Sequence, residues 1–149
     1  SYINNKTLKM KKLVLLVFTL SILTFSCSSD SDGISINQDL VGSWTGYVME
    51  RGCDVDLILN DDATGSLAFY GGMDCNDYDD LTWSASSSSL TLNYLTESLD
   101  ENGYFVVDED GNYVYEVYDS QVLNYELNSA GNVLTVTDED GTTSTLNAF

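Results

Sequence analysis

Cys53-Asp54-Val55-Asp56-Leu57-Ile58-Leu59 is the stretch of sequence that decides the fold. Its odd-numbered positions are apolar, whereas Asp54 and Asp56 carry charge. Successive side chains of a β-strand point to opposite faces, so this pattern predicts a strand with one buried and one solvated face. The same alternation recurs over residues 90–94 and 123–127.

Turn sequences separate the strand-like runs. Each is expected to place a Gly or Asn in the left-handed conformation that a hairpin needs. The turns are Asp61–Gly65, Glu101–Gly103, Asp108–Asn112, Ala130–Asn132 and Asp138–Gly141. Hairpins in series predict an all-β, antiparallel up-and-down meander of about 8–10 strands closed as a barrel or packed as a sandwich. The one helical element expected is a short turn over residues 37–41.

The N-terminal part of the chain resembles a secretory signal peptide over residues 10–26. Met10-Lys11-Lys12 supplies a positive start, and an apolar run from Leu13 to Phe25 follows. A bilayer-spanning helix needs about 20 apolar residues, so this run is too short for a permanent anchor. Residues 1–9 precede Met10 and are interpreted as an over-extended start site.

Leu23-Thr24-Phe25-Ser26-Cys27 resembles the lipobox of bacterial lipoproteins, although Phe25 stands where a small residue is usual. The resemblance implies cleavage before Cys27 and a lipid on that cysteine. The protein would then be membrane-anchored in the cell envelope, at the outer membrane or cell surface. The alternatives are an ordinary secretory signal cut nearby or an uncleaved anchor. Residues 27–37 are expected to form a flexible acidic tether, loosely similar to surface-export signals.

The charge of the chain is divided at Cys27. Lys6, Lys9, Lys11 and Lys12 precede it, while all 24 acidic residues follow it. The mature chain therefore carries one cation, Arg51, against 24 anions. Such a chain repels phosphate backbones, which excludes nucleic-acid binding, and its charge favours a soluble monomer. A basic protein partner is compatible with it.

Two cysteines remain in the mature chain. In an oxidising compartment Cys53 and Cys75 are expected to form a disulfide, which would stabilise the fold by roughly 3 kcal/mol in the chain-entropy model. The rival interpretation is a metal site. Since the chain contains no histidine, a zinc site would need two carboxylates beside the thiolates.

Gly42-Ser43-Trp44, at the start of the first expected strand, resembles the G-x-W signature of lipocalins. The hairpin rhythm of bacterial lipocalin-like lipoproteins is similar over the segments that follow. These are Asp62–Ser66, Trp83-Ser84, Ser89–Leu92 and Val133–Thr142. The resemblance implies a lipocalin-like barrel over residues 38–149 that carries a small apolar ligand. Lipocalins often cover the tryptophan with a basic residue of the last strand, and residues 145–149 contain none.

Aromatic residues are the candidates for lining a ligand cavity. We single out Trp44, Trp83, Tyr94, Tyr115 and Tyr125. The alternative is that these rings are ordinary core and cross-strand packing, where aromatic residues are common.

Acidic residues around Cys75 are weak candidates for a calcium site. They are Asp74, Asp77, Asp79 and Asp80, and the alternative is a solvated loop. Asp108-x-Asp110-x-Asn112 opens like an EF-hand loop, but Tyr113 occupies the position that requires glycine. We therefore expect no metal and no cofactor.

We expect a binding protein, not an enzyme. The chain has no histidine for a nucleophile–base pair, and no motif selects two carboxylates for glycoside hydrolysis. The first hypothesis is a lipid-anchored lipocalin-like protein that binds a small apolar molecule. The second is an acidic interaction module, such as an inhibitor or assembly factor, with a filled barrel. A cavity of at least about 300 Å³ would favour the first.

Mass spectrometry of the exported protein tests the anchor. We expect a mature chain that starts at an acylated Cys27, and accumulation of unacylated protein when Cys27→Ser is introduced. A free N-terminus away from Cys27 in the unsubstituted protein contradicts the lipoprotein interpretation.

Overall fold

The computed structural model of the protein describes residues 35–149. The expected start-site extension 1–9, the signal peptide 10–26, Cys27 and most of the tether lie outside the described residues. Within residues 35–149 no helix is long and apolar enough to cross a membrane.

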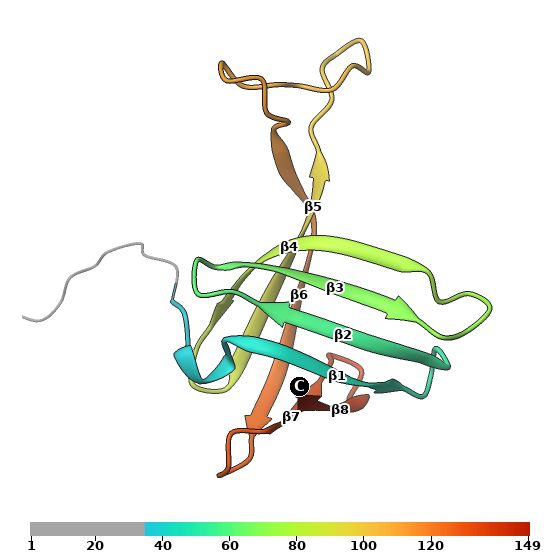
Figure 1. Ribbon diagram of the computed structural model, residues 1–149, viewed down its shortest axis with the longest axis vertical. Coiled ribbons are helices and arrows are strands. Elements are labelled where there is room, and N and C mark those ends of the chain that lie inside the picture. Colours follow the sequence, from blue (N-terminus) through green and yellow to red (C-terminus); the bar gives the residue numbers. More distant parts are fainter. Residues whose placement is uncertain (1–34) are drawn as a thin grey trace, which may run out of the picture. The chain divides into compact units, whose positions relative to one another are not determined.

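Eight antiparallel strands form the domain, and each strand pairs with the next along the chain. They are β1 (Gly42–Val48), β2 (Cys53–Leu59), β3 (Thr64–Tyr70), β4 (Asp77–Ala85), β5 (Ser89–Glu97), β6 (Tyr115–Leu127), β7 (Val133–Thr137) and β8 (Thr143–Ala148). Pairing of β1 with β8 closes the meander into a barrel (Figure 1). The prediction of an all-β up-and-down barrel is confirmed.

The two-residue alternation determines which side chains fill the barrel. On β2, Cys53, Val55, Leu57 and Leu59 are buried, while the residues between them are more exposed. Every strand contributes buried side chains to the resulting core. Near one end of the barrel, polar residues take the inward positions instead. Residues 34–149 contain all eight strands and this core, so we expect this barrel segment to fold on its own.

Closure of the barrel depends on a close approach of β1 to β8. Gly46 lies opposite Leu146 in this pair. A Cβ atom at position 46 would lie 2.5 Å from the carbonyl oxygen of Thr145 and 2.6 Å from Leu146 Cδ2. Only glycine therefore allows the first and last strands to pair here without displacing the backbone of β8.

One end of the barrel is closed by apolar packing. The short 3₁₀-helix η1 (Gln38–Leu40) precedes β1, in the place where a helical turn is expected, and buries Leu40 completely. The indole N–H of Trp44 donates to the carbonyl oxygen of Leu40 at 2.9 Å, and that of Trp83 donates to Asn60 O at 2.9 Å. The Tyr125 hydroxyl donates to Ser86 O at 2.7 Å. These bonds satisfy the polar atoms of the buried rings, as a closed core requires.

The hairpin turns follow the predicted chemistry with one exception. Gly103, Gly111, Gly131 and Gly141 all have φ between 71° and 85°. In the turn Asp61–Gly65 the expectation of a left-handed Gly or Asn is wrong, because Ala63 adopts the left-handed conformation with φ of 68°. Gly65 instead lies within β3, where a side chain would collide with the backbone of β2.

The connection between β5 and β6 forms a projecting arm of residues 98–114 (Figure 1). Two tight turns, each organised by an aspartate, shape this β5–β6 arm. Backbone N–H groups of Tyr104 and Asn102 donate to the Asp100 carboxylate and lower its pKa. The backbone N–H groups of Asn112 and Asp110 donate to the Asp108 carboxylate in the same way, the side-chain amide of Asn112 adds a further bond, and the pKa of Asp108 is also lowered. The arm therefore has defined turns although it lies outside the barrel.

Candidate functional site

A cavity of about 750 Å³ opens at the end of the barrel opposite the tryptophans. The connections β1–β2, β3–β4, β5–β6 and β7–β8 lie at this end, since the strands run alternately up and down. The floor of the cavity is apolar and comes from six strands, β2, β3 and β5 to β8. Its residues include Val55, Leu57, Leu67, Leu92, Leu123 and Leu146. The barrel is therefore hollow toward its open end.

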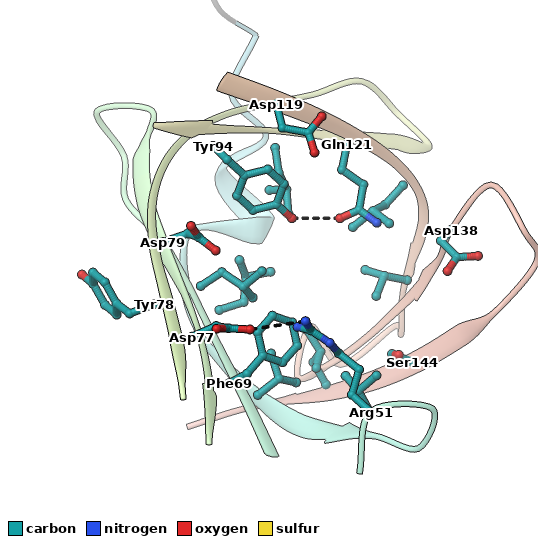
Figure 2. Close-up of a pocket in the computed structure, with 18 of the residues that line it drawn as sticks. Arg51, Phe69, Asp77, Tyr78, Asp79, Tyr94, Asp119, Gln121, Asp138 and Ser144 are labelled. Atoms are coloured by element: carbon teal, nitrogen blue, oxygen red, sulfur yellow. Dashed lines mark hydrogen bonds and ion pairs between the residues drawn. The ribbon is translucent and has the colours of Figure 1, made fainter. Parts of the chain in front are cut away.

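The mouth of the cavity is acidic because strand residues that should be apolar by position are carboxylates. Asp77 and Asp79 of β4 pair directly with Phe69 and Leu67, so they share the inward face with these residues. Figure 2 shows both carboxylates on the inner side of the barrel. Asp119 of β6 faces Tyr94 in the same way. Glu50 and Asp138 complete the acidic mouth from the β1–β2 and β7–β8 connections.

Arg51 places the one cation of residues 35–149 in this mouth. Its Nη2 lies 3.3 Å from Asp77 Oδ2, and its guanidinium carbon lies 4.4 Å from the centroid of the Phe69 ring (Figure 2). The side chains of Arg51 and Asp77 are about half exposed, at 49% and 54%. A pair in contact with water to this extent contributes at most about 1 kcal/mol and exchanges readily with solvent ions.

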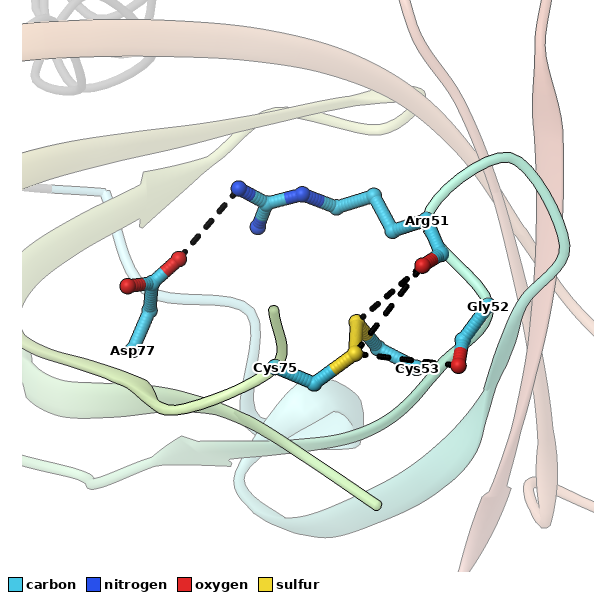
Figure 3. The surroundings of a disulfide bond; sticks show 5 residues. All are labelled: Arg51, Gly52, Cys53, Cys75 and Asp77. Carbon is cyan, nitrogen blue, oxygen red and sulfur yellow. Dashed lines mark hydrogen bonds and ion pairs between the residues drawn. A yellow bond between two sulfur atoms is a disulfide. The ribbon is translucent and has the colours of Figure 1, made fainter. Parts of the chain in front are cut away.

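The Cys53–Cys75 disulfide holds the two segments that carry this ion pair. Its Cα atoms are 5.6 Å apart, and the expected disulfide is confirmed. Arg51 precedes Cys53 by two residues, and Asp77 follows Cys75 by two. Carbonyl oxygens of the β1–β2 turn also contact the sulfur atoms, with Arg51 O 3.4 Å from Cys53 Sγ (Figure 3). The disulfide therefore fixes the start of β2 against the loop that leads into β4.

A β-bulge brings a second tyrosine to the mouth. Tyr94 pairs with Asp119, but Leu95 pairs with Val117, so Tyr118 is the extra residue of β6. Its hydroxyl donates to Asp79 Oδ1 at 2.9 Å, and its ring centroid lies 6.3 Å from that of Tyr94. Bulges commonly redirect a side chain next to a functional site, and this one adds an aromatic hydroxyl to the acidic mouth.

Tyr94 is the buried polar group of the cavity wall. It is 9% exposed, and its hydroxyl donates to Gln121 Oε1 at 2.8 Å (Figure 2). Burial and, next in size, the negative charge of Asp79 raise the pKa of Tyr94 to about 12. The hydroxyl thus stays protonated at neutral pH. The hydrogen bond to Asp79 likewise raises the pKa of Tyr118.

Of the aromatic residues predicted to line a cavity, Tyr94 lies in its wall. Trp44, Trp83 and Tyr125 are buried at the closed end and do not line it. Tyr115 is 49% exposed at the base of the β5–β6 arm and also lies outside it. For Trp44, Trp83 and Tyr125 the packing alternative describes the observed surroundings better, whereas Tyr115 lines a separate hollow together with Tyr78 and Asp80.

The four aspartates proposed as weak calcium ligands do not form a joint site. Asp77 pairs with Arg51, Asp79 accepts from Tyr118, and Asp80 accepts from Tyr78 on the outer face. The described residues contain no group of three or more acidic or cysteine side chains arranged to hold a metal ion. Asp74 lies in the β3–β4 loop and is exposed.

The sequence reasoning named Asp77 and Asp79 only as weak calcium candidates in a loop and did not name Asp119, although a signal for their inward placement was present. Asp77 and Asp79 have the same parity as Leu81 and Trp83, whose side chains are buried. Asp119 likewise has the parity of Leu123. A carboxylate at a position that the alternation assigns to the buried face predicts a charge that points inward. Such charges are typical of functional sites.

Comparisons with known proteins add no identity to this geometry. No protein family, curated protein or solved structure matches the chain.

The raised pKa of Tyr94 predicts a pH-dependent loss of stability. The unfolded chain releases the phenolic proton near pH 10, whereas the folded protein retains it until about pH 12. The stabilisation is thus complete below pH 10 and is lost between about pH 10 and 12. We expect the free energy of unfolding to fall by about 2 kcal/mol from this group over that interval.

Denaturant unfolding at successive pH values measures this loss. Tyr94→Phe should abolish this fall in the free energy of unfolding. Tyr104→Phe, at a position that is 72% exposed, should leave the fall unchanged. The same pH dependence in Tyr94→Phe and the unsubstituted protein would contradict the assignment.

Proposed function

We propose that the protein is a lipid-anchored lipoprotein of the cell envelope whose lipocalin-like barrel binds a small molecule with an apolar body. Its place would be the outer membrane or the cell surface, attached through Cys27. The observation that carries the proposal is the cavity of about 750 Å³ with its apolar floor. Ligand-binding pockets typically measure about 300–1,000 Å³ and combine apolar walls with a few polar groups.

The cavity combines an apolar floor with a polar entrance. Leucine and valine side chains form the buried part, and hydroxyl and carboxylate groups lie near the entrance. A ligand entering between the loops would bury its apolar surface against the floor, which supplies most of the affinity of such sites. The hollow interior also argues against a filled barrel.

Binding of the neutral dye N-phenyl-1-naphthylamine to the barrel segment 34–149 tests this proposal. The emission of this dye rises in apolar surroundings, so we expect saturable enhancement. Val136→Trp should weaken binding at least about 10-fold, because Val136 lines the cavity and a larger ring would occupy it.

Val122→Trp is the matched control, since Val122 is 45% exposed and lies outside the cavity wall. Circular dichroism verifies the fold, and Val136→Phe replaces Val136→Trp if the latter is misfolded. Equal binding by the Val136 and Val122 variants, or no binding by the unsubstituted barrel, would refute the cavity as a ligand site.

The β5–β6 arm supports a second candidate function, the binding of a basic protein partner. Its apolar and aromatic side chains are exposed without a cover. They are Leu99, Tyr104, Phe105, Val107 and Tyr113, each more than half exposed. The arm also carries five acidic residues and no basic one. Exposed apolar patches with a charged rim are typical of interaction sites, and the charge favours a basic partner.

Photo-crosslinking from position 104 tests this second function. In envelope preparations of the source cells we expect one specific adduct with a basic protein. It should disappear at about 0.5 M salt and be absent when the crosslinker stands at position 122. The same adducts from both positions would contradict a partner site on the arm.

A further inference from the structure

The mouth of the cavity has an unbalanced charge. Glu50, Asp77, Asp79, Asp119 and Asp138 line it, and Arg51 is the one basic residue among the lining side chains. Since the ion pair with Asp77 accounts for one carboxylate, the others face the entrance without a cationic partner in the described part of the chain. The entrance therefore has a negative potential, and low-dielectric walls concentrate it.

Arg51 itself shows how a cation sits in this mouth. Its guanidinium lies between a carboxylate, at 3.3 Å, and the face of the Phe69 ring, at 4.4 Å. A carboxylate combined with an aromatic face is a general arrangement for binding organic cations. This observation does not depend on the number of carboxylates at the mouth, because it shows one cation, the Arg51 guanidinium, bound at the cavity entrance.

The hydroxyl groups beside the mouth leave acceptors for a further cation. Tyr118 donates its proton to Asp79, and Tyr94 donates to Gln121, so both hydroxyl oxygens retain lone pairs. Asp119 accepts the backbone N–H of Ser120 at 2.8 Å and retains further acceptor sites. An ammonium group has three N–H donors and no acceptor, which matches such surroundings.

We infer that the ligand of this cavity is a cationic amphiphile, with an apolar body on the leucine floor and an ammonium or amidinium head among the mouth carboxylates. This inference rests on the proposed function and adds the ligand class to it. An anionic head would meet Arg51 but also the four carboxylates that Arg51 does not pair. A neutral head would gain nothing from the charge.

Displacement of N-phenyl-1-naphthylamine by decylammonium, decanoate and 1-decanol tests the inference, because these ligands share one chain and differ in head charge. Measurements use the barrel segment 34–149 at pH 7, below the micelle concentrations. We expect decylammonium to displace the dye at concentrations at least about 10-fold lower than decanoate and below those of decanol. Raised salt should reduce this preference.

Single substitutions locate the preference at the mouth. Asp79→Asn and Asp119→Asn should each reduce the preference for decylammonium over decanoate at least about 3-fold. Asp80→Asn, which removes the same charge from the outer face of β4, should leave it unchanged. Arg51→Gln should tighten decylammonium binding, since it removes the internal competitor.

The outcomes separate this inference from the function on which it rests. If the dye binds and decylammonium has no advantage over decanoate and decanol, the cationic specificity is wrong and the cavity function stands. Tighter binding of decanoate, lost in Arg51→Gln, would assign the site to anions instead. An equal effect of Asp80→Asn and Asp79→Asn would refute recognition at the mouth. If neither the dye nor any of the decyl ligands binds, the proposed function fails as well.

Discussion

The pairing of β1 with β8 is the constraint on which the rest of this structure depends. Without it, the sheet would have two open edges and no interior, and the inward leucines would face water. Closure requires the two backbones to approach at Gly46, where any side chain would meet Thr145 O. Once the sheet is closed, inward positions of every strand converge on one axis, so a floor and a mouth arise from residues far apart in the chain.

The two ends of the barrel differ in packing and in charge. At one end, η1 and the indoles of Trp44 and Trp83 form a buried plug in which both indole N–H groups are hydrogen-bonded. At the other end, the core stops short and carboxylates occupy inward positions. Burying charge there would be costly, so these groups remain in contact with water and the cavity stays open.

Much of this fold could be predicted from the sequence because its information is local. Alternation over residues 53–59 determines the buried face of β2, and glycines such as Gly111 and Gly141 fix the hairpins. The site was less accessible. Whether an aromatic ring fills a core or lines a cavity depends on its height along the barrel axis, which periodicity does not contain, so Trp83 and Tyr94 could not be distinguished.

The bulge at Tyr118 is likewise a property of strand pairing and has no signature in a single strand. The placement of Arg51 over Phe69 depends on a loop and a disulfide acting together. Tertiary geometry of this kind determines the entrance, whereas local pattern determines the wall.

The Cys53–Cys75 bond ties the two strand segments that carry the Arg51–Asp77 pair, and it takes no part in closing the barrel. Formation of the barrel and completion of its entrance are therefore separate chemical events. A chain with free thiols could assemble all its hydrogen-bonded ladders while the guanidinium and its carboxylate partner remained on independently moving loops. Oxidation would then be the finishing step, because it ties together the two segments that carry this ion pair at the entrance of a barrel that is already folded.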